Sequence, residues 1–355
     1  MRRGLIARSK AELPDAIFAG RVERTRAAMT KAGLGALVVY SNNTRAAGAS
    51  WLTGFVPYWS EGVMVLTRAG DPALVVALSK RVQTWIEATS RVASVVSTPR
   101  IGAETAKLIA ASGGGAVGVA DLDGFPAGIA DDMRAAGCAL ADATDMFAAL
   151  RGPADPAELA LAAHAAAIAH DALACILPEH GDANAVIAAV EGRARAHAAE
   201  ECYVALAPDL ARERRFKRIE GQASLGRSHA IRATVAYKGA WVRLARTVFR
   251  DHDKAHIAPA AAEVFAACVA GLPQASGFGG ASAWLVEGCR VAQPLEALMG
   301  SRVDAPRRPA PGALVSVTTC IEHEGEPVML AAPALLGASG EPAALLVPPV
   351  FREGD

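Results

Sequence analysis

Residues 150–173 read LRGPADPAELALAAHAAAIAHDAL, a turn segment with one glycine and two prolines that runs into a long stretch rich in alanine and leucine. Glycine and proline interrupt regular structure, and the apolar stretch favours a helix that Asp155 can cap. A second helix of similar character is predicted at residues 184–199. A chain of 355 residues is about twice the usual single-domain length. We therefore expect an N-terminal domain at residues 1–149 and a C-terminal domain at residues 150–355.

The N-terminal half alternates between helical and strand-like patterns. Residues 17–32 space apolar and charged side chains as an amphipathic helix does, and the glycines that follow end it. Short apolar strands are predicted at residues 36–40, 62–67, 73–78 and 116–120. This alternation predicts a compact α/β domain.

Beyond its two helices, the C-terminal half is predicted to consist mainly of strands separated by glycine and proline turns. The strand-like segments are YVALA, HAIRATVAY, GAWVRLARTVF, ASAWLVEG, ALVSVTTCIEH and PVMLAAPALL, at residues 203–207, 229–237, 239–249, 281–288, 313–323 and 327–336. One further helix is expected at about residues 260–270. The predicted fold class is therefore α/β (α+β) with two domains.

Charge and composition disfavour two classes of function. The chain is 52% hydrophobic and 20% charged, with 36 basic and 36 acidic residues, so it offers no overall field for nucleic acid or an anionic membrane. The basic run RERRFKR, residues 212–218, is interpreted as a solvated loop or a subunit contact. No apolar run approaches the roughly 18–20 residues of a membrane span, and the N-terminus turns polar too early for an export signal. Scattered cysteines without a CxxC pair suit reduced thiols, so we expect a cytoplasmic chain without disulfides.

Several segments resemble, in their order and wording, the creatinase, prolidase and aminopeptidase P family. Residues 41–55, SNNTRAAGASWLTGF, are similar to the family segment that ends in YLTGF. Residues 150–173 are similar to the family's domain-opening segment, and YKGAWVRLARTV at 237–248 resembles the motif Gly-Tyr, a few residues, Asp and Arg-Thr. Residues 311–336 close the chain like the family's last two strands. The resemblance implies a creatinase-like α/β domain followed by a pita-bread domain.

The same resemblance implies a site for two metal ions, which the family holds with two Asp, two Glu and one His. Every one of these positions is substituted. Arg232 and Arg243 stand at the Asp positions, Thr318 and Ala331 at the Glu positions, and Phe278 is the expected replacement for the His. Two guanidinium groups repel a divalent ion. A metal-dependent peptidase is therefore disfavoured, and no metal or other cofactor is expected.

A cationic, hydrogen-bonding pocket is expected in place of the metal. Arg232 and Arg243 are predicted to bind substrate, because buried guanidinium groups require an anion, either a small ligand or an internal partner such as Glu287 or Glu322. Strand alternation places residue 243 and Arg246 on opposite faces. Arg246 matches the arginine of the family's Arg-Thr pair and is assigned either to a structural salt bridge or to substrate contact.

His229 is the main candidate for acid–base chemistry, because it lies just upstream of the strand segment that carries Arg232. A substrate-binding His also precedes this strand in the family, although a strand-edge histidine facing water is the alternative. Trp241, Glu322 and His323 complete the candidate substrate site. His323, in the turn IEHEGEP, equally fits a solvated hairpin tip.

The N-terminal domain contributes one further candidate, Arg45, beside the segment similar to YLTGF. In the family's dimers this domain of one subunit approaches the cavity of the other, so the resemblance implies a contribution to the ligand site in trans from Arg45 or Trp59. A homodimer, or a heterodimer with a metal-bearing paralogue, is accordingly expected. Cys202 is interpreted as a small buried residue and not as a nucleophile.

Two functions from different classes fit these observations. The first is a metal-independent hydrolase or lyase acting on a small C–N-bonded, carboxylate-bearing substrate. In this case Arg232 and Arg243 orient the anion and His229 serves as acid or base. Creatinase, within the same family, resembles a metal-free hydrolase, which implies that loss of the metal is not loss of catalysis. The second is a non-catalytic pseudoenzyme that binds a small anion or serves as the inactive partner subunit of a metal-bearing paralogue.

Overall fold

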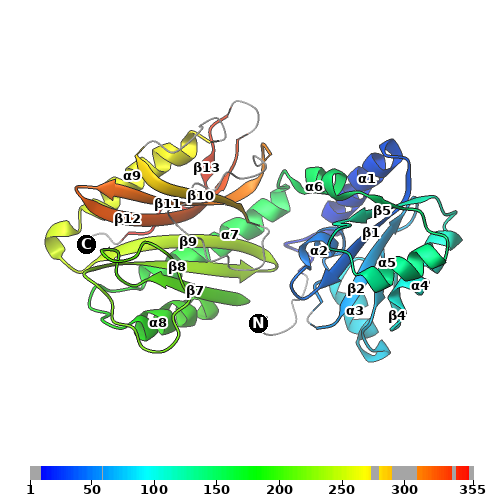
Figure 1. Cartoon of the computed structure of the whole chain (residues 1–355), viewed down its shortest axis with the longest axis horizontal. Helices are drawn as coiled ribbons and strands as arrows, with labels where there is room; N and C mark the ends of the chain where they lie inside the picture. Colours follow the sequence, from blue (N-terminus) through cyan, green and yellow to red (C-terminus); the bar gives the residue numbers. More distant parts are fainter. Residues whose placement is uncertain (1–8, 58, 273–279, 290–309, 338–340, 352–355) are drawn as a thin grey trace. The chain divides into compact units, whose positions relative to one another are not determined.

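The computed structural model describes residues 9–57, 59–272, 280–289, 310–337 and 341–351. The chain divides into two compact units, Arg2–Arg151 and Gly152–Asp355, whose elements are labelled in Figure 1. This division lies two residues after the end of the predicted N-terminal domain at residue 149.

The N-terminal unit is a six-stranded sheet in the order β4-β3-β2-β1-β5-β6. Its strands are β1 (Leu34–Asn42), β2 (Glu61–Thr67), β3 (Ala73–Val76), β4 (Ser94–Ser97), β5 (Ala116–Ala120) and β6 (Leu140–Asp142). Its helices are α1 (Asp15–Lys31), α2 (Ala47–Thr53), α3 (Gln83–Thr89), α4 (Ile101–Ala111), α5 (Ala127–Ala135) and α6 (Thr144–Arg151), with a 3₁₀ turn at Lys80–Val82. Because β1 is buried on both faces, separate apolar clusters pack on each side of it, which confirms the predicted α/β domain.

Two glycines set the path from α1 into β1. Gly33 has a φ of 69°, a left-handed conformation that glycine adopts without steric cost. A Cβ at Gly35 would lie 2.2 Å from the carbonyl oxygen of Gly114, at the neighbouring entry to β5. Glycine at 35 therefore lets the two parallel strands begin side by side.

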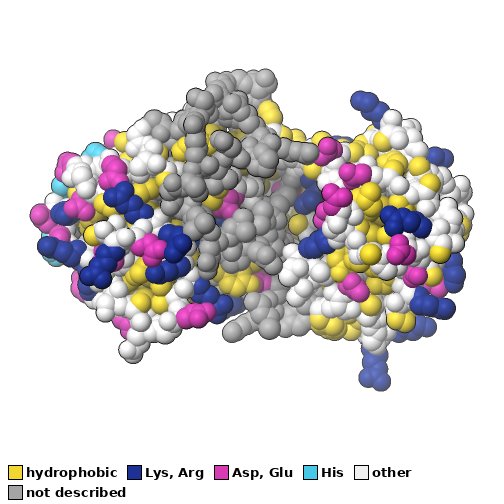
Figure 2. Space-filling view, viewed as in Figure 1, with side chains coloured by type: hydrophobic (Ala, Val, Ile, Leu, Met, Phe, Trp, Pro, Cys, Tyr) yellow, Lys and Arg dark blue, Asp and Glu magenta, His cyan; other side chains and the backbone are white. Residues whose placement is uncertain are grey.

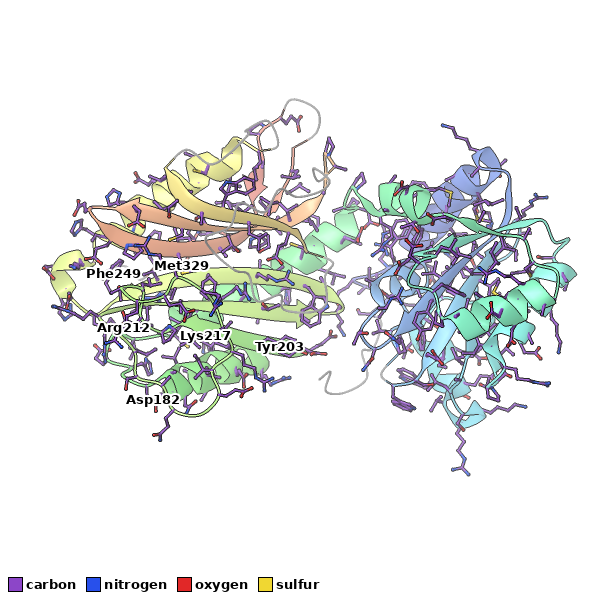
Figure 3. The ribbon with its side chains drawn as sticks, in the orientation of Figure 1. Asp182, Tyr203, Arg212, Lys217, Phe249 and Met329 are labelled. Atoms are coloured by element: carbon purple, nitrogen blue, oxygen red, sulfur yellow. The ribbon has the colours of Figure 1, made fainter. Side chains whose placement is uncertain are left out.

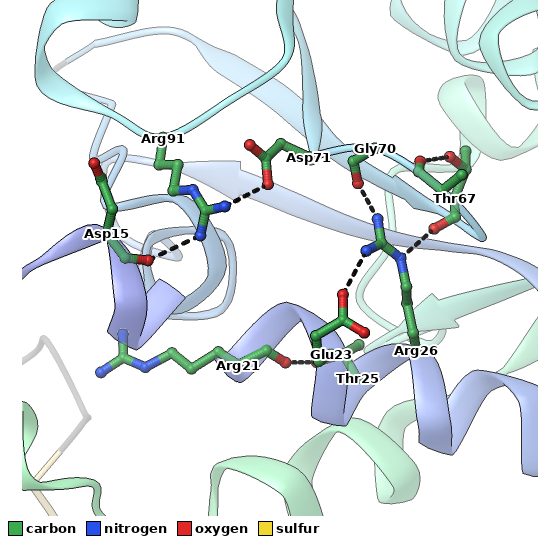
Figure 4. A network of polar contacts seen from close by, with 10 residues as sticks. Asp15, Arg21, Glu23, Thr25, Arg26, Thr67, Gly70, Asp71 and Arg91 are labelled. Atoms are coloured by element: carbon green, nitrogen blue, oxygen red, sulfur yellow. Dashed lines mark hydrogen bonds and ion pairs between the residues drawn. The ribbon is translucent and has the colours of Figure 1, made fainter. Parts of the chain in front are cut away.

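Arginines tie the first helix and the α3–β4 loop to the sheet (Figure 4). Arg26 of α1 donates to the carbonyl oxygens of Thr67, at 3.1 Å, and of Gly70, in the turn after β2. Arg91, between α3 and β4, forms an ion pair with Asp71 at 2.9 Å. These contacts hold the rim of the unit.

The C-terminal unit is a seven-stranded antiparallel sheet in the order β10-β11-β12-β9-β8-β7, with β13 beside β12. Its strands are β7 (Glu201–Ala207), β8 (Ser228–Tyr237), β9 (Ala240–Phe249), β10 (Ala281–Gly288), β11 (Leu314–His323), β12 (Glu326–Leu335) and β13 (Ala344–Leu345). Its helices are α7 (Pro156–Ala174), α8 (Ala183–Ala196) and α9 (Ile257–Ala270), with a 3₁₀ turn at His252–Lys254. The predicted order of helices and strands is confirmed.

The start of α7 confirms the predicted helix cap. The side chain of Asp155 accepts from the backbone N–H of Glu158 at 3.0 Å, and the side chain of Glu158 accepts from the backbone N–H of Asp155 at 3.3 Å. Pro156 occupies the first helical position, where its missing N–H costs nothing. This reciprocal capping box fixes where the second unit begins its helix.

Helices α7, α8 and α9 cover the same face of the sheet in the C-terminal unit. Helices α7 and α8 share an apolar cluster with β7, β8 and β9, and α9 shares another with β11 and β12. Ala245 of β9 and Ala331 of β12 stand opposite each other and belong to a separate cluster on the other face. We call this other face the site face, because Arg232, Arg243, Thr318 and Ala331 of β8, β9, β11 and β12 point to it.

Basic and acidic side chains lie next to one another on the surfaces shown in Figure 2, in keeping with their equal numbers in the sequence. Neither sign of charge forms a dominating patch on the visible face of either unit. Within the described ranges, no helix combines the length and the apolar character that crossing a bilayer requires.

Candidate functional site

The predicted metal-ligand positions converge on the site face. Arg232 stands opposite Ala245, Ala245 opposite Ala331, and Ala331 opposite Thr318, so one row crosses β8, β9, β12 and β11. Arg243 precedes Ala245 by two residues and therefore points to the same face. The structure thus brings four of the five positions together, and the fifth, Phe278, lies outside the described residues.

The two halves of the sheet are joined at the centre of this row by a threonine. The hydroxyl of Thr247 in β9 donates to the carbonyl oxygen of Met329 in β12 at 3.0 Å and accepts from its N–H at 2.8 Å. One side chain therefore replaces a pair of backbone hydrogen bonds. This link holds β9 and β12 in the register that places Ala245 opposite Ala331.

The side chains at these positions do not fit a dinuclear metal centre. Arginine carries only donors and a fixed positive charge, alanine has no ligand atom, and threonine offers one neutral hydroxyl. Among the described residues, no group of three or more His, Cys, Asp or Glu side chains could hold a metal ion. The ligand chemistry that hard divalent ions need is carboxylate-based, and it is missing from the four described positions.

Arg243 is buried beside a carboxylate from the neighbouring half of the sheet. Its Nε lies 3.9 Å from Oε2 of Glu287 in β10, and the two side chains are 0% and 5% exposed. Neither carboxylate oxygen of Glu287 accepts a hydrogen bond within the described part of the chain. Ser316, opposite Glu287 in the register, donates to the carbonyl oxygen of Arg243 at 3.1 Å. Of the two internal partners proposed from the sequence, the structure therefore places Glu287 near Arg243.

Arg232 is buried against an aromatic ring. Its guanidinium carbon lies 5.1 Å from the ring centroid of Phe216, which belongs to the loop between β7 and β8. This cation–π contact offsets part of the cost of burying the charge of Arg232. Trp241, two residues before Arg243, stacks on Tyr203 with ring centroids 5.8 Å apart and planes 2° from parallel. Trp241 thus lies on the site face, as part of an aromatic pair.

His229 and Arg246 lie on the opposite, helix-covered face. His229 stands opposite Val248 and Arg246 opposite Ile231, and both of these apolar residues pack in the cluster under α7 and α8. Arg246 donates to the carbonyl oxygen of Leu173 at 3.1 Å, which is a structural role. The structure therefore does not bring His229 or Arg246 together with the arginines of the site face.

Burial controls the protonation of His229. The side chain is 0% exposed, and burial, followed by the nearby charge of Arg250, lowers its pKa to about 4. Neither ring nitrogen has a hydrogen-bond partner among the described residues, although the backbone of Gly226 slightly favours the protonated ring. A neutral imidazole on the far side of the sheet cannot exchange protons with a ligand beside Arg232.

Within the C-terminal unit, the remaining predicted site residues, Glu322 and His323, lie outside the row. Glu322 forms an ion pair with Arg214 of the β7–β8 loop and not with Arg243. His323, at the start of the turn between β11 and β12, lies 4.0 Å from Glu324 and is partly exposed, as a hairpin tip would be. In the N-terminal unit, Arg45 forms an ion pair with Asp121.

Cys202 is buried and packs with the helices, and burial raises the pKa of its thiol to about 12. It is therefore unsuited to act as a nucleophile at neutral pH, which agrees with its interpretation from the sequence as a small buried residue.

Phe216 is a site-face residue that the sequence did not point to. Its signal was a single aromatic residue inside the otherwise charged run RERRFKR, where an apolar ring has no reason to remain in water.

The geometry can support one kind of chemistry on the site face. Arg232 and Arg243 supply positive charge and planar donors, which suit a carboxylate. Thr318 and Thr234, the latter opposite Arg243, add hydroxyls. Glu287 is the described carboxylate next to this group that could take or give a proton.

Comparison with known proteins supports this reading of the fold. Residues 21–152 match the family model of the creatinase/prolidase N-terminal domain. No curated protein matches the chain in sequence. The sequence match therefore covers the N-terminal unit, and the C-terminal unit is compared with known proteins through its structure.

Solved structures of similar fold cover nearly the whole chain. An Xaa-Pro dipeptidase from Bacillus anthracis is 15% identical with a TM-score of 0.67, over 94% of this chain and 99% of that one. An X-Pro aminopeptidase from Thermotoga maritima is 13% identical with a TM-score of 0.68, over 93% and 99%. The dipeptidase PepE from Mycobacterium ulcerans is 20% identical with a TM-score of 0.63, over 96% and 97%. These likenesses establish the two-domain pita-bread fold.

Proposed function

Given a creatinase/prolidase N-terminal domain and the fold of the Xaa-Pro peptidases, we propose that this chain is a metal-independent relative that binds a small carboxylate-bearing molecule without hydrolysing it. One observation carries the proposal. Three of the four described positions, Arg232, Ala331 and Thr318, lie in one row, and the fourth, Arg243, points to the same face two residues from Ala245 of that row. A hydrolase fold has thus kept positive charge at its centre while changing the source of that charge from metal ions to guanidinium groups.

The ligand class follows from the geometry of the guanidinium group. Arginine presents paired N–H donors that match the two oxygens of a carboxylate. A dipeptide, the substrate class in the name of one structural relative, carries such a carboxylate next to a C–N bond. Dipeptides, guanidino acids and betaine-like compounds are therefore the first ligands to test. A homodimer, or a heterodimer with a metal-bearing paralogue, stays a prediction that the solution mass of the assembly will check.

Metal content gives the first test. Protein purified without chelators is expected to contain well below one metal ion per chain, and a chelator is expected to leave its Tm unchanged, because arginine and alanine supply no ligands. Elemental analysis and a thermal melt with and without the chelator measure both. A stoichiometric metal together with a lower Tm after chelation would overturn the proposal.

Ligand binding gives the second test. A carboxylate that binds the folded chain is expected to raise Tm by roughly 5–10 °C at one hundred times its Kd, for a unit of this size. Arg243→Lys keeps the charge opposite Glu287 but loses the paired donors, so it should remove most of the shift. Arg193→Gln, on the exposed surface of α8, should retain it. If the amide analogue of the ligand shifts Tm as much as the acid does, carboxylate recognition is wrong.

A metal-independent hydrolase or lyase of a C–N bond is the second candidate, and Glu287 is the observation that favours it. A carboxylate 3.9 Å from a guanidinium could accept a proton while the arginine holds the substrate. In this case the same panel of compounds would be turned over, and Glu287→Gln would abolish turnover without abolishing binding. His229→Gln would leave turnover unchanged, because its ring lies on the other face of the sheet.

A further inference from the structure

The connection between β7 and β8 is unusually long for a compact unit. Residues 208–227 lie between Ala207, where β7 ends, and Ser228, where β8 begins, and they contain no helix or named strand. Loops longer than roughly 12–15 residues without secondary structure are commonly functional. We call residues 208–227 the strap.

Two apolar side chains of the strap are buried on the site face. Phe216 is 0% exposed and Leu210 is 1% exposed. They belong to one cluster with Cys320 of β11 and Met329 of β12, from the far half of the sheet. The ring of Phe216 also faces the guanidinium of Arg232. The strap therefore places an aromatic side chain at the centre of the row described above.

A few local contacts hold the strap in this position. Leu206 and Lys217 exchange two backbone hydrogen bonds, each 2.9 Å long. Arg214 forms an ion pair with Glu322 at the far side of the sheet. Figure 3 labels Arg212 and Lys217 of the strap, together with Tyr203 and Met329 of the strands. The C-terminal end of the strap is anchored more firmly, because Leu225 packs in the cluster of α7 and α8 and the carbonyl oxygen of Ala223 accepts from the N–H of Ala183. The part of the strap over the site face, residues 210–218, is therefore the lightly held part.

The outer side of the strap is charged and solvated. Arg212 is 87% exposed, and Lys217 and Arg215 pair with Glu213 at the surface. Exposed ion pairs contribute little to stability, and segments held by few buried contacts open at lower free energy than the sheet beneath them. Opening at residues 210–218 removes Leu210 and Phe216 from the cluster but leaves the strand ladder and the buried Leu225 in place.

We propose that the strap is a lid, that the ring of Phe216 occupies the space beside Arg232 that the ligand would take, and that the strap must open to admit it. This inference rests on the proposed ligand site at Arg232. It adds that the conformation described here is the closed one. The chain would then bind its ligand only through the fraction of molecules whose strap is open, which lowers the apparent affinity.

Two native cysteines report strap opening without any ligand. Cys320 lies under the strap, in the cluster of Phe216, and is 1% exposed. Cys202 lies in the helix-side core of the same unit and is 4% exposed. The full chain is treated with iodoacetamide under native conditions, and peptide mass spectrometry follows each thiol, normalised to its rate in urea. Cys320 is expected to react at least about tenfold faster than Cys202, because strap opening suffices to expose it.

Variants separate opening of the strap from unfolding of the unit. Phe216→Ala and Arg214→Gln are expected to raise the normalised rate of Cys320 alkylation at least about threefold. The normalised rate of Cys202 alkylation should equal that of the matched control variant. The matched controls are Phe265→Ala, in the core under α9, and Arg193→Gln, in an exposed ion pair of α8. Arg214→Gln removes no core side chain, so it remains informative if Phe216→Ala does not fold.

Equal rates for Cys320 and Cys202, moving together in every variant, would show that the strap opens only on unfolding and would overturn the proposal. Because no ligand is present, this result is separate from the metal and carboxylate tests. If no carboxylate raises Tm but Cys320 reacts selectively, the lid proposal stands and the proposed carboxylate ligand is wrong. If a carboxylate raises Tm but the two cysteines react at equal rates, the ligand proposal stands and the lid proposal is wrong.

Discussion

Replacing Glu287 by leucine is expected to lower the free energy of unfolding by about 3–5 kcal/mol, because it removes the carboxylate that faces the buried guanidinium of Arg243. A buried charge that loses its counter-charge keeps its desolvation cost and loses the attraction that offset it. Equilibrium urea unfolding of the full chain measures the change. The distance of 3.9 Å makes this an electrostatic contact and not a hydrogen bond, so Glu287→Gln should cost nearly as much as leucine.

The double variant Arg243→Met with Glu287→Leu is the informative control. Replacing both members of a buried pair by apolar residues of similar volume is commonly neutral or stabilising, so it should recover most of the loss. Glu104→Gln, which breaks the exposed pair with Lys107 in the N-terminal unit, should change stability by less than about 1 kcal/mol. If Glu287→Leu costs no more than Glu104→Gln, Glu287 is not the partner that stabilises Arg243.

Local sequence signals predicted the fold well where one signal had one structural outcome. The turn segment and Asp155 predicted the start of α7, and the capping box realises it with both hydrogen bonds. Alternating apolar runs predicted β8, β9, β11 and β12 nearly at their observed bounds. These elements are long and strongly patterned, so little beyond local chemistry is needed to identify them.

Predicting which residues share the site also depends on the alternation of side chains along each strand, which can be read from the sequence. Strand alternation predicts that Arg243 and Arg246 lie on opposite faces, and the structure confirms this prediction. The same rule separates His229 from Arg232, because an odd spacing of three residues reverses the face. This alternation therefore excludes His229 from a site that contains Arg232.

Other features of the site depend on register, which a single sequence does not encode locally. Arg243 could have met Glu287 or Glu322, and the pairing of β10 with β11 decides for Glu287. Glu322 instead meets Arg214 of the strap, 108 residues earlier in the chain. Contacts over such separations follow from the tertiary fold, so only the structure could choose between the two carboxylates.

Burial of His229 predicts that the chain loses stability on mild acidification. The ordinary pKa of histidine is near 6.5, and that of His229 in the folded chain is about 4. Between these values the unfolded chain binds a proton that the folded chain refuses, so the free energy of unfolding falls as pH falls. The full loss from this one group is about 3 kcal/mol, and it is complete below pH 4. Above pH 6.5 the ring is neutral in both states and contributes nothing to the pH dependence.

His229→Gln isolates this contribution, because glutamine does not titrate. Urea unfolding measures the free energy of unfolding at several pH values between 4 and 7. From pH 7 to pH 4 this free energy should fall by about 3 kcal/mol less in His229→Gln than in the parent chain. His256→Gln provides a control of opposite sign, since the hydrogen bond to Glu324 raises the pKa of His256. That bond stabilises the chain fully below the unfolded pKa, and its contribution disappears as pH rises through the raised folded value. Identical pH profiles for the parent chain and His229→Gln would mean that His229 is protonated or solvated in the folded state, contrary to its burial.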